Sequence, residues 1–259
     1  MLRKIYDNLY VVGDTRTLFI DGVNTLVFAD LHLGFEEDMA RNGYFIPRAQ
    51  LSRAIKFIDK AFSIIGNIDT IIIDGDLKHA FDKLLRQERY EVKKFLDYLI
   101  NEKNVKEIII IRGNHDNYIP IILKDYDIDL HITYDLYVGD QKILLTHGHL
   151  DIDIEGYEAI IIGHEHPSIG IVDELGLLTK VHCYLKTPTI DKAHIIVLPA
   201  LGAYQAGNTI SLDRENYLSP IMRKYGLIEE TIPIAIIEDT GVLELPRLEI
   251  LFMREQMVL

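Results

Sequence analysis

The chain has 259 residues, of which 48% are hydrophobic, and it carries 27 basic against 40 acidic side chains, a formal net charge of −13. This length and composition allow one large hydrophobic core and exclude a largely disordered chain. An acidic molecule repels a polyanion unless a basic face compensates, so the composition by itself argues against extended duplex binding.

The sequence contains no apolar stretch near the roughly 20 residues that a membrane span requires. The segment from Met1 to Asp7 also lacks the apolar core of a signal peptide. Cys183 is the single cysteine, so a disulfide within the chain is excluded. We therefore expect a cytoplasmic protein that does not associate with membranes.

The first half of the chain alternates short apolar runs with helical patterns. Runs without charge, typical of strands buried on both faces, predict strands over 25–29, 70–73, 108–111, 143–145 and 159–162. Between the first three strands, apolar residues at helical spacing predict two helices. The first has Pro47 in its first turn and ends at Gly66-Asn67, and the second covers 81–102. This order predicts a parallel core with right-handed crossovers.

From about Leu130 onward the pattern changes to short strands joined by tight turns, and it predicts further strands over 169–172, 176–184 and 194–198. The segments 232–237 and 242–245 flank a turn and predict a hairpin. We expect one domain over residues 1–215 and a C-terminal β extension, 216–259, packed on the same domain. This extension would serve either dimerisation or the covering of a sheet edge.

Each of the first five predicted strands is followed by a motif rich in Asp, Asn and His. In chain order the motifs are Asp30-Leu31-His32, Gly75-Asp76, Gly113-Asn114-His115-Asp116, Thr146-His147-Gly148-His149 and Gly163-His164-Glu165-His166. One such histidine alone would be an ordinary loop residue. Ligands gather at the carboxyl ends of strands in open α/β sheets, and side chains two residues apart on an extended segment point to the same side. The set therefore predicts a two-metal hydrolase site.

The residue types of these motifs restrict the metal and the chemistry. Imidazole, carboxylate and amide oxygen suit Mn²⁺, Fe or Zn²⁺, whereas Ca²⁺ and Mg²⁺ sites use nearly all oxygens. Two divalent ions facing two carboxylates would leave such a centre at about +2, which favours hydroxide and an incoming phosphate oxygen. Ions about 3.5 to 4 Å apart can generate a bridging hydroxide and clamp a phosphoryl group for in-line displacement.

The motif order resembles that of the calcineurin-like metallophosphoesterases, whose pattern runs D-x-H, GD, GNH(D/E), H and GHxH. The match spans about residues 26 to 166. This resemblance implies an α/β (α+β) fold, a four-layer αββα sandwich with two mixed β-sheets and the metals at the edge of the sheets.

The resemblance also implies the ligands of two divalent ions. One ion would be held by Asp30, His32 and His166, the other by Asn114, His147 and His164, with Asp76 bridging the two. His149 lies two residues beyond His147, so either histidine of that pair could be the ligand. Mn²⁺ is our first choice of metal. Fe, Zn²⁺ and Ni²⁺ stay open, because such sites follow availability as well as affinity.

By the same resemblance, His115 would contact the phosphate and protonate the leaving oxygen as general acid, with Asp116 orienting its ring. Alternatively, His115 only supports the neighbouring ligand through a hydrogen bond. Lys78 and His79 closely follow Asp76 and could reach the substrate phosphate, as could His149. Equally, Lys78 and His79 could be surface residues on the turn into the second helix.

Further stretches around the first two motifs look like the archaeal SbcD-related phosphoesterases and the bacterial phosphoesterases associated with DNA ligase. Those relatives imply a phosphodiesterase or nuclease acting on DNA ends or nucleotides. Protein Ser/Thr phosphatases continue the GD motif with Asp-Arg-Gly, whereas this chain continues with Leu77-Lys78-His79-Ala80, so we do not expect a phosphoprotein phosphatase. Full SbcD nucleases carry a further cap and an ATPase-binding segment, and 259 residues are too few for both. We therefore expect a small substrate or a DNA-processing partner protein that completes the groove.

Two basic stripes could contact nucleic acid, although a solvated outer face is the favoured interpretation. They are Arg53, Lys56 and Lys60 on the first predicted helix and Arg86, Arg89 and Lys93 on the second. Two other functions stay open, a non-catalytic metal-binding scaffold in a protein complex and a small-molecule phosphomonoesterase. A homodimer is a further option that the sequence leaves undecided.

Overall fold

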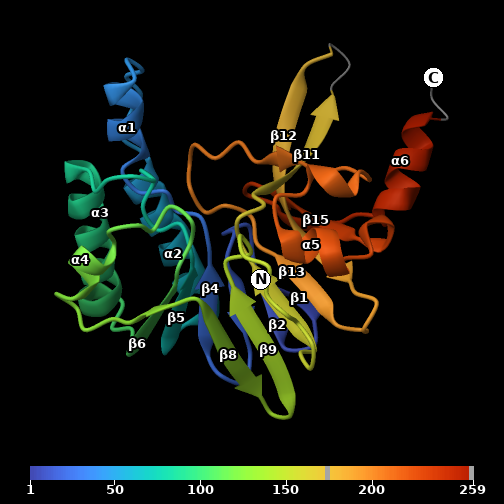
Figure 1. Cartoon of the computed structure of the whole chain (residues 1–259), viewed down its shortest axis with the longest axis horizontal. Coiled ribbons are helices and arrows are strands. Elements are labelled where there is room, and N and C mark those ends of the chain that lie inside the picture. Colours follow the sequence, from blue (N-terminus) through green and yellow to red (C-terminus); the bar gives the residue numbers. More distant parts are fainter. Residues whose placement is uncertain (173–175, 257–259) are drawn as a thin grey trace.

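The computed structural model describes residues 1–172 and 176–256 of the chain. Two mixed β-sheets lie face to face in its centre, with helices on the outer side of each (Figure 1). The layers therefore run helix, sheet, sheet, helix, and the predicted αββα sandwich is confirmed.

The first sheet has the strand order β1-β2-β3-β4-β5-β6-β7. Its strands are β1 (Leu2–Tyr6), β2 (Leu9–Val12), β3 (Leu18–Ile20), β4 (Thr25–Phe28), β5 (Thr70–Asp74), β6 (Glu107–Ile111) and β7 (Leu130–His131). Strands β1 to β4 pair antiparallel, whereas β4 to β7 pair parallel. As a result, β4, β5 and β6 all end at the same edge of the sheet.

Helices cover the outer face of the first sheet, on the left of Figure 1. They are α1 (Phe35–Arg41), α2 (Gln50–Ile65), α3 (Arg86–Asp97) and α4 (Pro120–Leu123), and α3 continues into the short π-helix η1 (Tyr98–Glu102). The predicted ends of the two long helices are confirmed, because Gly66 caps α2 with a φ of 94° and η1 stops at Glu102.

The predicted starts of both helices were too early. Helix α2 begins at Gln50 because the Glu36 carboxylate accepts the backbone N–H groups of Ala49 and Gln50, at 2.8 and 2.9 Å, and so caps its first turn. Helix α3 begins at Arg86 because Glu88 accepts the N–H of Leu85 at 2.6 Å. Both helix starts depend on buried carboxylates rather than on the apolar pattern.

The second sheet has the order β14-β11-β12-β13-β10-β9-β8. It also contains β15, which pairs with β12, and β16, which pairs with β15. Its strands are β8 (Thr133–Val138), β9 (Gln141–Thr146), β10 (Ala159–Ile162), β11 (Pro167–Val172), β12 (Leu178–Pro188), β13 (His194–Val197), β14 (Asn208–Thr209), β15 (Ile232–Ile237) and β16 (Gly241–Glu244). Because β9, β10 and β13 are parallel, they also end at a common edge. The predicted C-terminal hairpin is confirmed by the antiparallel pair β15 and β16.

We predicted a β extension after residue 215, but this segment contains helices as well as strands. It contains α5 (Pro220–Tyr225), the 3-10 helix η3 (Ile228–Glu230) and α6 (Leu248–Gln256), while the 3-10 helix η2 (Arg214–Asn216) crosses its start. Strand β15 pairs antiparallel with β12 of the second sheet. The division into a domain and an extension at residue 215 stays a prediction.

The central strands bury side chains on both faces. On β5, Ile71 and Ile73 pack beneath α2 and α3, whereas Ile72 packs between the two sheets. On β10, Ile161 packs between the sheets and Ile160 packs toward α5. The period of two expected for strands thus divides the interior into three apolar layers, which hold the strand ends rigidly. Among the described residues, no helix combines the length and the apolar character needed to cross a bilayer.

Candidate metal centre

The loops after β4 and β5 run side by side beyond the strands. Asp30 donates its backbone N–H to the Gly75 carbonyl at 3.0 Å, and His32 donates to the Asp76 carbonyl at 2.9 Å. The loop after β13 joins them, because Gly202 donates its N–H to the Asp30 carbonyl at 3.0 Å. Backbone hydrogen bonds therefore fix the positions of the first two motifs.

Most of the predicted ligand residues have a strained backbone. Left-handed φ values occur at Asp30 (59°), His32 (49°), Asp76 (50°), His164 (65°) and His166 (45°). For residues other than glycine, such conformations cost on the order of 1–3 kcal/mol each and cluster at functional sites. The bends redirect the chain where each strand ends and bring these side chains together.

The first group of potential ligands combines Asp30, His32, Asp76 and His166. One ligand atom from each residue lies within 4.8 Å of all the others. His166 Nε2 is 3.0 Å from Asp30 Oδ1, and His32 Nε2 is 3.8 Å from Asp76 Oδ2. Two carboxylates and two imidazoles at this spacing can hold a divalent transition-metal ion.

The second group combines Asp76, His147 and His164, again with ligand atoms within 4.8 Å of one another. His147 Nε2 lies 3.4 Å from Asp76 Oδ2. Asp76 therefore belongs to both groups, as a carboxylate that bridges two ions would.

Asn114 lies beside the second group and has a polar atom without a partner. Its side-chain oxygen Oδ1 is buried and has no hydrogen-bond partner. The neighbouring His115 donates its backbone N–H to Asp76 Oδ1 at 2.9 Å, so the Asn114 segment is held against the shared carboxylate. An orphaned amide oxygen in this position needs a cation or a water, and it fits the donor set of a divalent ion.

The alternative ligand His149 lies outside both groups. Its ring centroid is 5.4 Å from that of His147, and its Nδ1 is buried without a hydrogen-bond partner. Burial lowers the pKa of His149 to about 4. The geometry favours His147 as the ligand of this motif.

The protonation states of His32 and His164 suit metal binding, whereas His147 must release a proton before it can hold an ion. Burial lowers the pKa of His32 to about 3 and that of His164 to about 4, so both rings are neutral at pH 7 and keep a lone pair. Burial opposes the charged form of His147 too, but the attraction of Asp76 outweighs it and raises the pKa of His147 to about 10. Asp76 thus attracts positive charge at the centre of the two groups.

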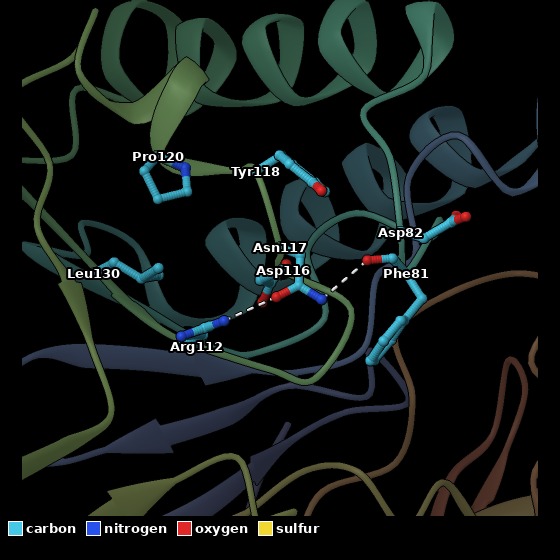
Figure 2. A pocket seen from close by; sticks show the side chains of 8 residues that line it. All are labelled: Phe81, Asp82, Arg112, Asp116, Asn117, Tyr118, Pro120 and Leu130. Atoms are coloured by element: carbon cyan, nitrogen blue, oxygen red, sulfur yellow. Dashed lines mark hydrogen bonds between the residues drawn. The ribbon is translucent and has the colours of Figure 1, made fainter.

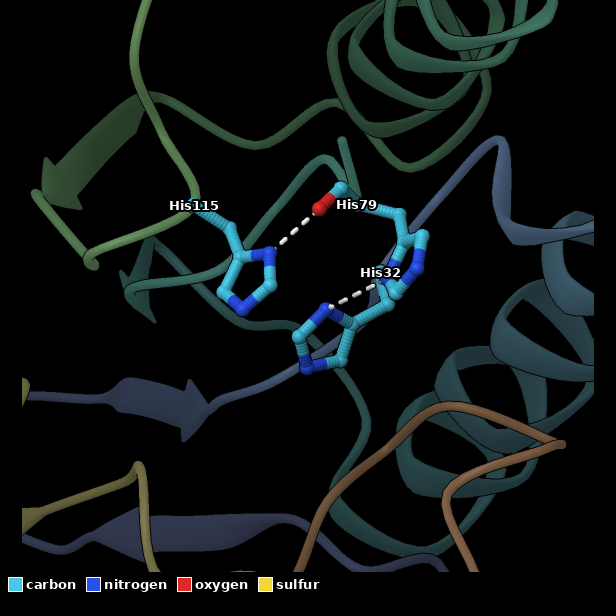
Figure 3. A group of neighbouring side chains, drawn as sticks. All are labelled: His32, His79 and His115. Atoms are coloured by element: carbon cyan, nitrogen blue, oxygen red, sulfur yellow. Dashed lines mark hydrogen bonds between the residues drawn. The ribbon is translucent and has the colours of Figure 1, made fainter. Parts of the chain in front are cut away.

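Three histidines form a cluster on one side of the centre (Figure 3). The Nδ1 atoms of His79 and His32 lie 3.4 Å apart, and the rings of His79 and His115 stack at 5.5 Å. His115 Nδ1 bonds to the His79 carbonyl, while its Nε2 lies 4.0 Å from Asp76 Oδ2. His115 and His79 are both half-buried and lie next to the candidate ligands.

The prediction that Asp116 orients the His115 ring was wrong. The buried carboxylate of Asp116 instead accepts backbone N–H groups at 2.8 to 3.3 Å, from Gly113, Asp76, Leu77 and Lys78. Burial raises its pKa to about 6. The carbonyl of His79 orients the His115 ring, and Asp116 holds the loops after β5 and β6 together.

The position of Lys78 argues against contact with a substrate. Its side chain is fully buried, and its ammonium donates to the Ala80 carbonyl and lies 4.0 Å from Glu88 Oε1. Burial lowers the pKa of Lys78. The geometry favours a structural role in the turn before α3.

Gln50 is a residue whose role at the centre the sequence analysis missed. Its buried side-chain amide donates to the carbonyls of Leu31 and His32, at 3.2 and 3.3 Å, and so supports the first motif. The spacing of Gln50 in the sequence could have revealed this role, because Gln50 continues the buried stripe formed by Ala54 and Ile58 on α2. A polar residue on that stripe indicates a specific hydrogen-bond partner.

Glu165 was also missed, although it lies between two candidate ligands. Its buried carboxylate accepts the N–H groups of Leu218 and Ser219, at 3.0 and 2.6 Å, just before α5. It thereby attaches the last motif to the C-terminal segment.

Gly75 provides a test of this geometry. A Cβ at this position would overlap His147 Nδ1, and φ is +83°. We expect Gly75→Ala to displace His147 and to lower metal affinity by roughly 10- to 100-fold or more, as loss of ligand orientation does. Metal titration of the purified variant measures this effect.

Gly156→Ala is the matched control, because Gly156 has a φ of +82° and no atom lies within 4 Å of the place that its new methyl group would occupy. This variant should carry only the backbone strain of about 1–2 kcal/mol. Equal metal affinity in the two variants would contradict the arrangement of His147 against Gly75.

The chain is similar to a known protein family and to several solved structures. The model of the calcineurin-like phosphoesterase family matches residues 23–168, more than half of the chain. The crystal structure of Pseudomonas putida nuclease MPE superposes with a TM-score of 0.61 at 18% identity, covering 94% of this chain and 100% of that one. A novel archaeal phosphodiesterase gives a TM-score of 0.39 at 18% identity, covering 86% and 98% of the two chains.

No curated protein matches the chain. At 18% identity the similarity to nuclease MPE shows a shared fold. The family match covers the segment that carries all five motifs. The chain therefore belongs to the calcineurin-like phosphoesterase family and is a metal-dependent phosphoesterase.

Proposed function

We propose that this chain is a dinuclear-metal phosphodiesterase that cleaves phosphodiester bonds of DNA or of a nucleotide. The observation that supports it most directly is the position of Asp76, which belongs to two groups of potential metal ligands at once. A carboxylate shared in this way is what a pair of ions requires, whereas a closed structural zinc site takes only four ligands.

In this proposal Asp30, His32 and His166 hold one ion, Asn114, His147 and His164 hold the other, and Asp76 bridges them. The mixed nitrogen and oxygen donors favour a transition metal, and Mn²⁺ is the first candidate. When bound, two such ions supply an activated water and neutralise charge on the phosphoryl oxygens.

His115 supplies the proton for the leaving oxygen in this proposal. Its Nδ1 faces the His79 carbonyl, which can only accept a hydrogen bond, so Nδ1 carries a proton in either charge state of the ring. Nε2 is then the atom that gains and loses a proton, and it faces the shared carboxylate at 4.0 Å. His79 keeps the ring in this orientation.

The choice of a diester rests on two supports. The motif after Asp76 departs from that of the protein phosphatases, and the chain shares its fold with a protein described as a nuclease. A homodimer, or a DNA-processing partner protein that completes the substrate groove, is compatible with this proposal.

The test is hydrolysis of bis-p-nitrophenyl phosphate and of p-nitrophenyl phosphate by metal-stripped protein that is repleted separately with Mn²⁺, Zn²⁺ and Mg²⁺. We expect Mn²⁺-dependent cleavage of the diester at a higher kcat/KM than of the monoester. A preference for the monoester would indicate a small-molecule phosphomonoesterase. Silence with every metal would contradict the proposal and favour a metal-binding scaffold.

A further inference from the structure

A cavity of about 490 Å³ lies between the turn before α3 and the loop that follows β6 (Figure 2). We call it the flanking pocket, and its lining residues are Phe81, Asp82, Arg112, Asp116, Asn117, Tyr118, Pro120 and Leu130. Its walls come from the turn before α3, from the loop between β6 and α4, and from the starts of α4 and β7.

Phe81 connects the flanking pocket to the metal centre. Its ring meets the His115 ring edge to face at a centroid distance of 5.9 Å and an angle of 90°. Phe81 is nevertheless 56% exposed, so a large part of the ring is not covered by the protein. An aromatic ring that contacts the proposed acid and also faces solvent can support a second ring.

A chain of hydrogen bonds holds the cationic wall of the pocket in place. Arg112 Nη2 donates to Asn117 Oδ1 at 2.8 Å, and Asn117 Nδ2 donates to the Phe81 carbonyl at 3.0 Å (Figure 2). Of the two acidic residues in the lining, Asp116 accepts backbone N–H groups, while Asp82 is 77% exposed and lies 3.6 Å from Lys83 Nζ. Arg112 is exposed and has no ion-pair partner within the part of the chain that the structure describes.

Tyr118 adds a second exposed ring to the pocket. Its backbone is left-handed, with a φ of 67°, and its side chain is 50% exposed. A bulky residue in this conformation is a genuine outlier, and such strain concentrates at functional sites. The strained residue thus contributes to the lining an aromatic side chain that stays half exposed.

We propose that the flanking pocket binds the nucleoside of the leaving group when a phosphodiester is cleaved. This inference rests on the proposed function and adds a substrate class to it. Two exposed aromatic rings beside a guanidinium and an amide match a nucleobase, which stacks on aromatic side chains and hydrogen-bonds at its edge. In a chain with a net charge of −13, the exposed Arg112 in the lining also favours an anionic strand.

The position of the pocket determines which part of the substrate it binds. His115 would protonate the leaving oxygen, so the group attached to that oxygen must lie close to the His115 ring. The flanking pocket begins at the ring of Phe81, which touches His115. The leaving nucleoside therefore reaches the pocket without crossing the ligand groups of the metals.

The test compares the full-length, Mn²⁺-repleted protein with the variants Phe81→Ala and Tyr118→Gly. Glycine suits the φ of 67° at position 118, so this variant removes the ring without adding strain. The substrates are single-stranded oligothymidylate and bis-p-nitrophenyl phosphate, and orthophosphate inhibition of the second reaction reports on the metal centre. Tyr137→Ala is the control, since Tyr137 is a 58% exposed aromatic residue on β8, outside the pocket.

We expect each pocket variant to raise the KM for oligothymidylate roughly tenfold, as loss of a stacking ring does, with orthophosphate inhibition unchanged. The control should keep the KM of the unmodified protein. An unchanged KM in both pocket variants, or weaker orthophosphate inhibition alongside the raised KM, would overturn the assignment of the pocket.

Two outcomes separate this inference from the proposed function. Hydrolysis of bis-p-nitrophenyl phosphate without cleavage of oligothymidylate by the unmodified protein would overturn the nucleoside pocket and leave the phosphodiesterase standing. No hydrolysis of either substrate would contradict the phosphodiesterase itself, and the pocket assignment with it.

Discussion

Replacing Asp76 by Asn is expected to remove at least one bound metal ion per chain and to abolish most of the diester hydrolysis. Asp76 Oδ2 lies 3.4 Å from His147 Nε2 and 3.8 Å from His32 Nε2, so its charge serves both ligand groups. Changing residues that only support metal ligands costs 10- to 100-fold in affinity or activity, and the loss of a shared ligand should exceed roughly 100-fold. Elemental analysis after dialysis and the rate with bis-p-nitrophenyl phosphate measure the two effects.

Asp38→Asn is the control for this variant. Asp38 lies near the histidine cluster, with Oδ2 at 3.8 Å from His79 Nε2, but belongs to neither of the two Asp76 groups. It should keep the full metal content. An Asp76→Asn protein that retained both ions and its activity would remove Asp76 from the bridging position.

His115→Asn is expected to lower kcat while leaving the metal content unchanged. General acid catalysis typically contributes 10²- to 10⁴-fold, and we expect a loss of that order with oligothymidylate, whose alkoxide leaving group requires a proton. The loss should be smaller with bis-p-nitrophenyl phosphate, because p-nitrophenolate leaves readily without one. The comparison of kcat for the two substrates therefore distinguishes an acid from a residue that only shapes the site.

His194→Asn serves as the control for the substitution itself, because His194 packs against Tyr6 at a centroid distance of 4.5 Å, away from the candidate ligands. It should leave kcat unchanged for both substrates. If His115→Asn instead lost metal and slowed both substrates equally, His115 would be a metal ligand together with His32 and His79, the third group that the structure brings together.

Local patterns accounted for the strands that carry the site. The predicted strand over 159–162 agrees with β10, and the other four agree with β4, β5, β6 and β9 to within one or two residues at each end. Such runs can be recognised because a strand buried on both faces needs uninterrupted β-branched and apolar residues. The motif at each strand end then indicated which side chains would meet.

Sequence patterns did not predict the contacts between segments that lie far apart in the chain. Helix α2 begins three residues after Pro47, because Glu36 caps it from α1. Asp116 follows His115 in the chain but binds the loop after β5, while the His79 carbonyl orients the His115 ring. Adjacency in sequence suggested a partner that the fold does not provide.

The sequence by itself determined the kinds of ligand, their order and their places at strand ends, because residue type and strand periodicity are local properties. Only the tertiary structure decided that Asp116 binds the loop after β5, that Lys78 is buried, and that Phe81 and Tyr118 line one cavity. Each of these outcomes depends on how loops from different strands pack against one another, and that packing is set by the two stacked sheets as a whole.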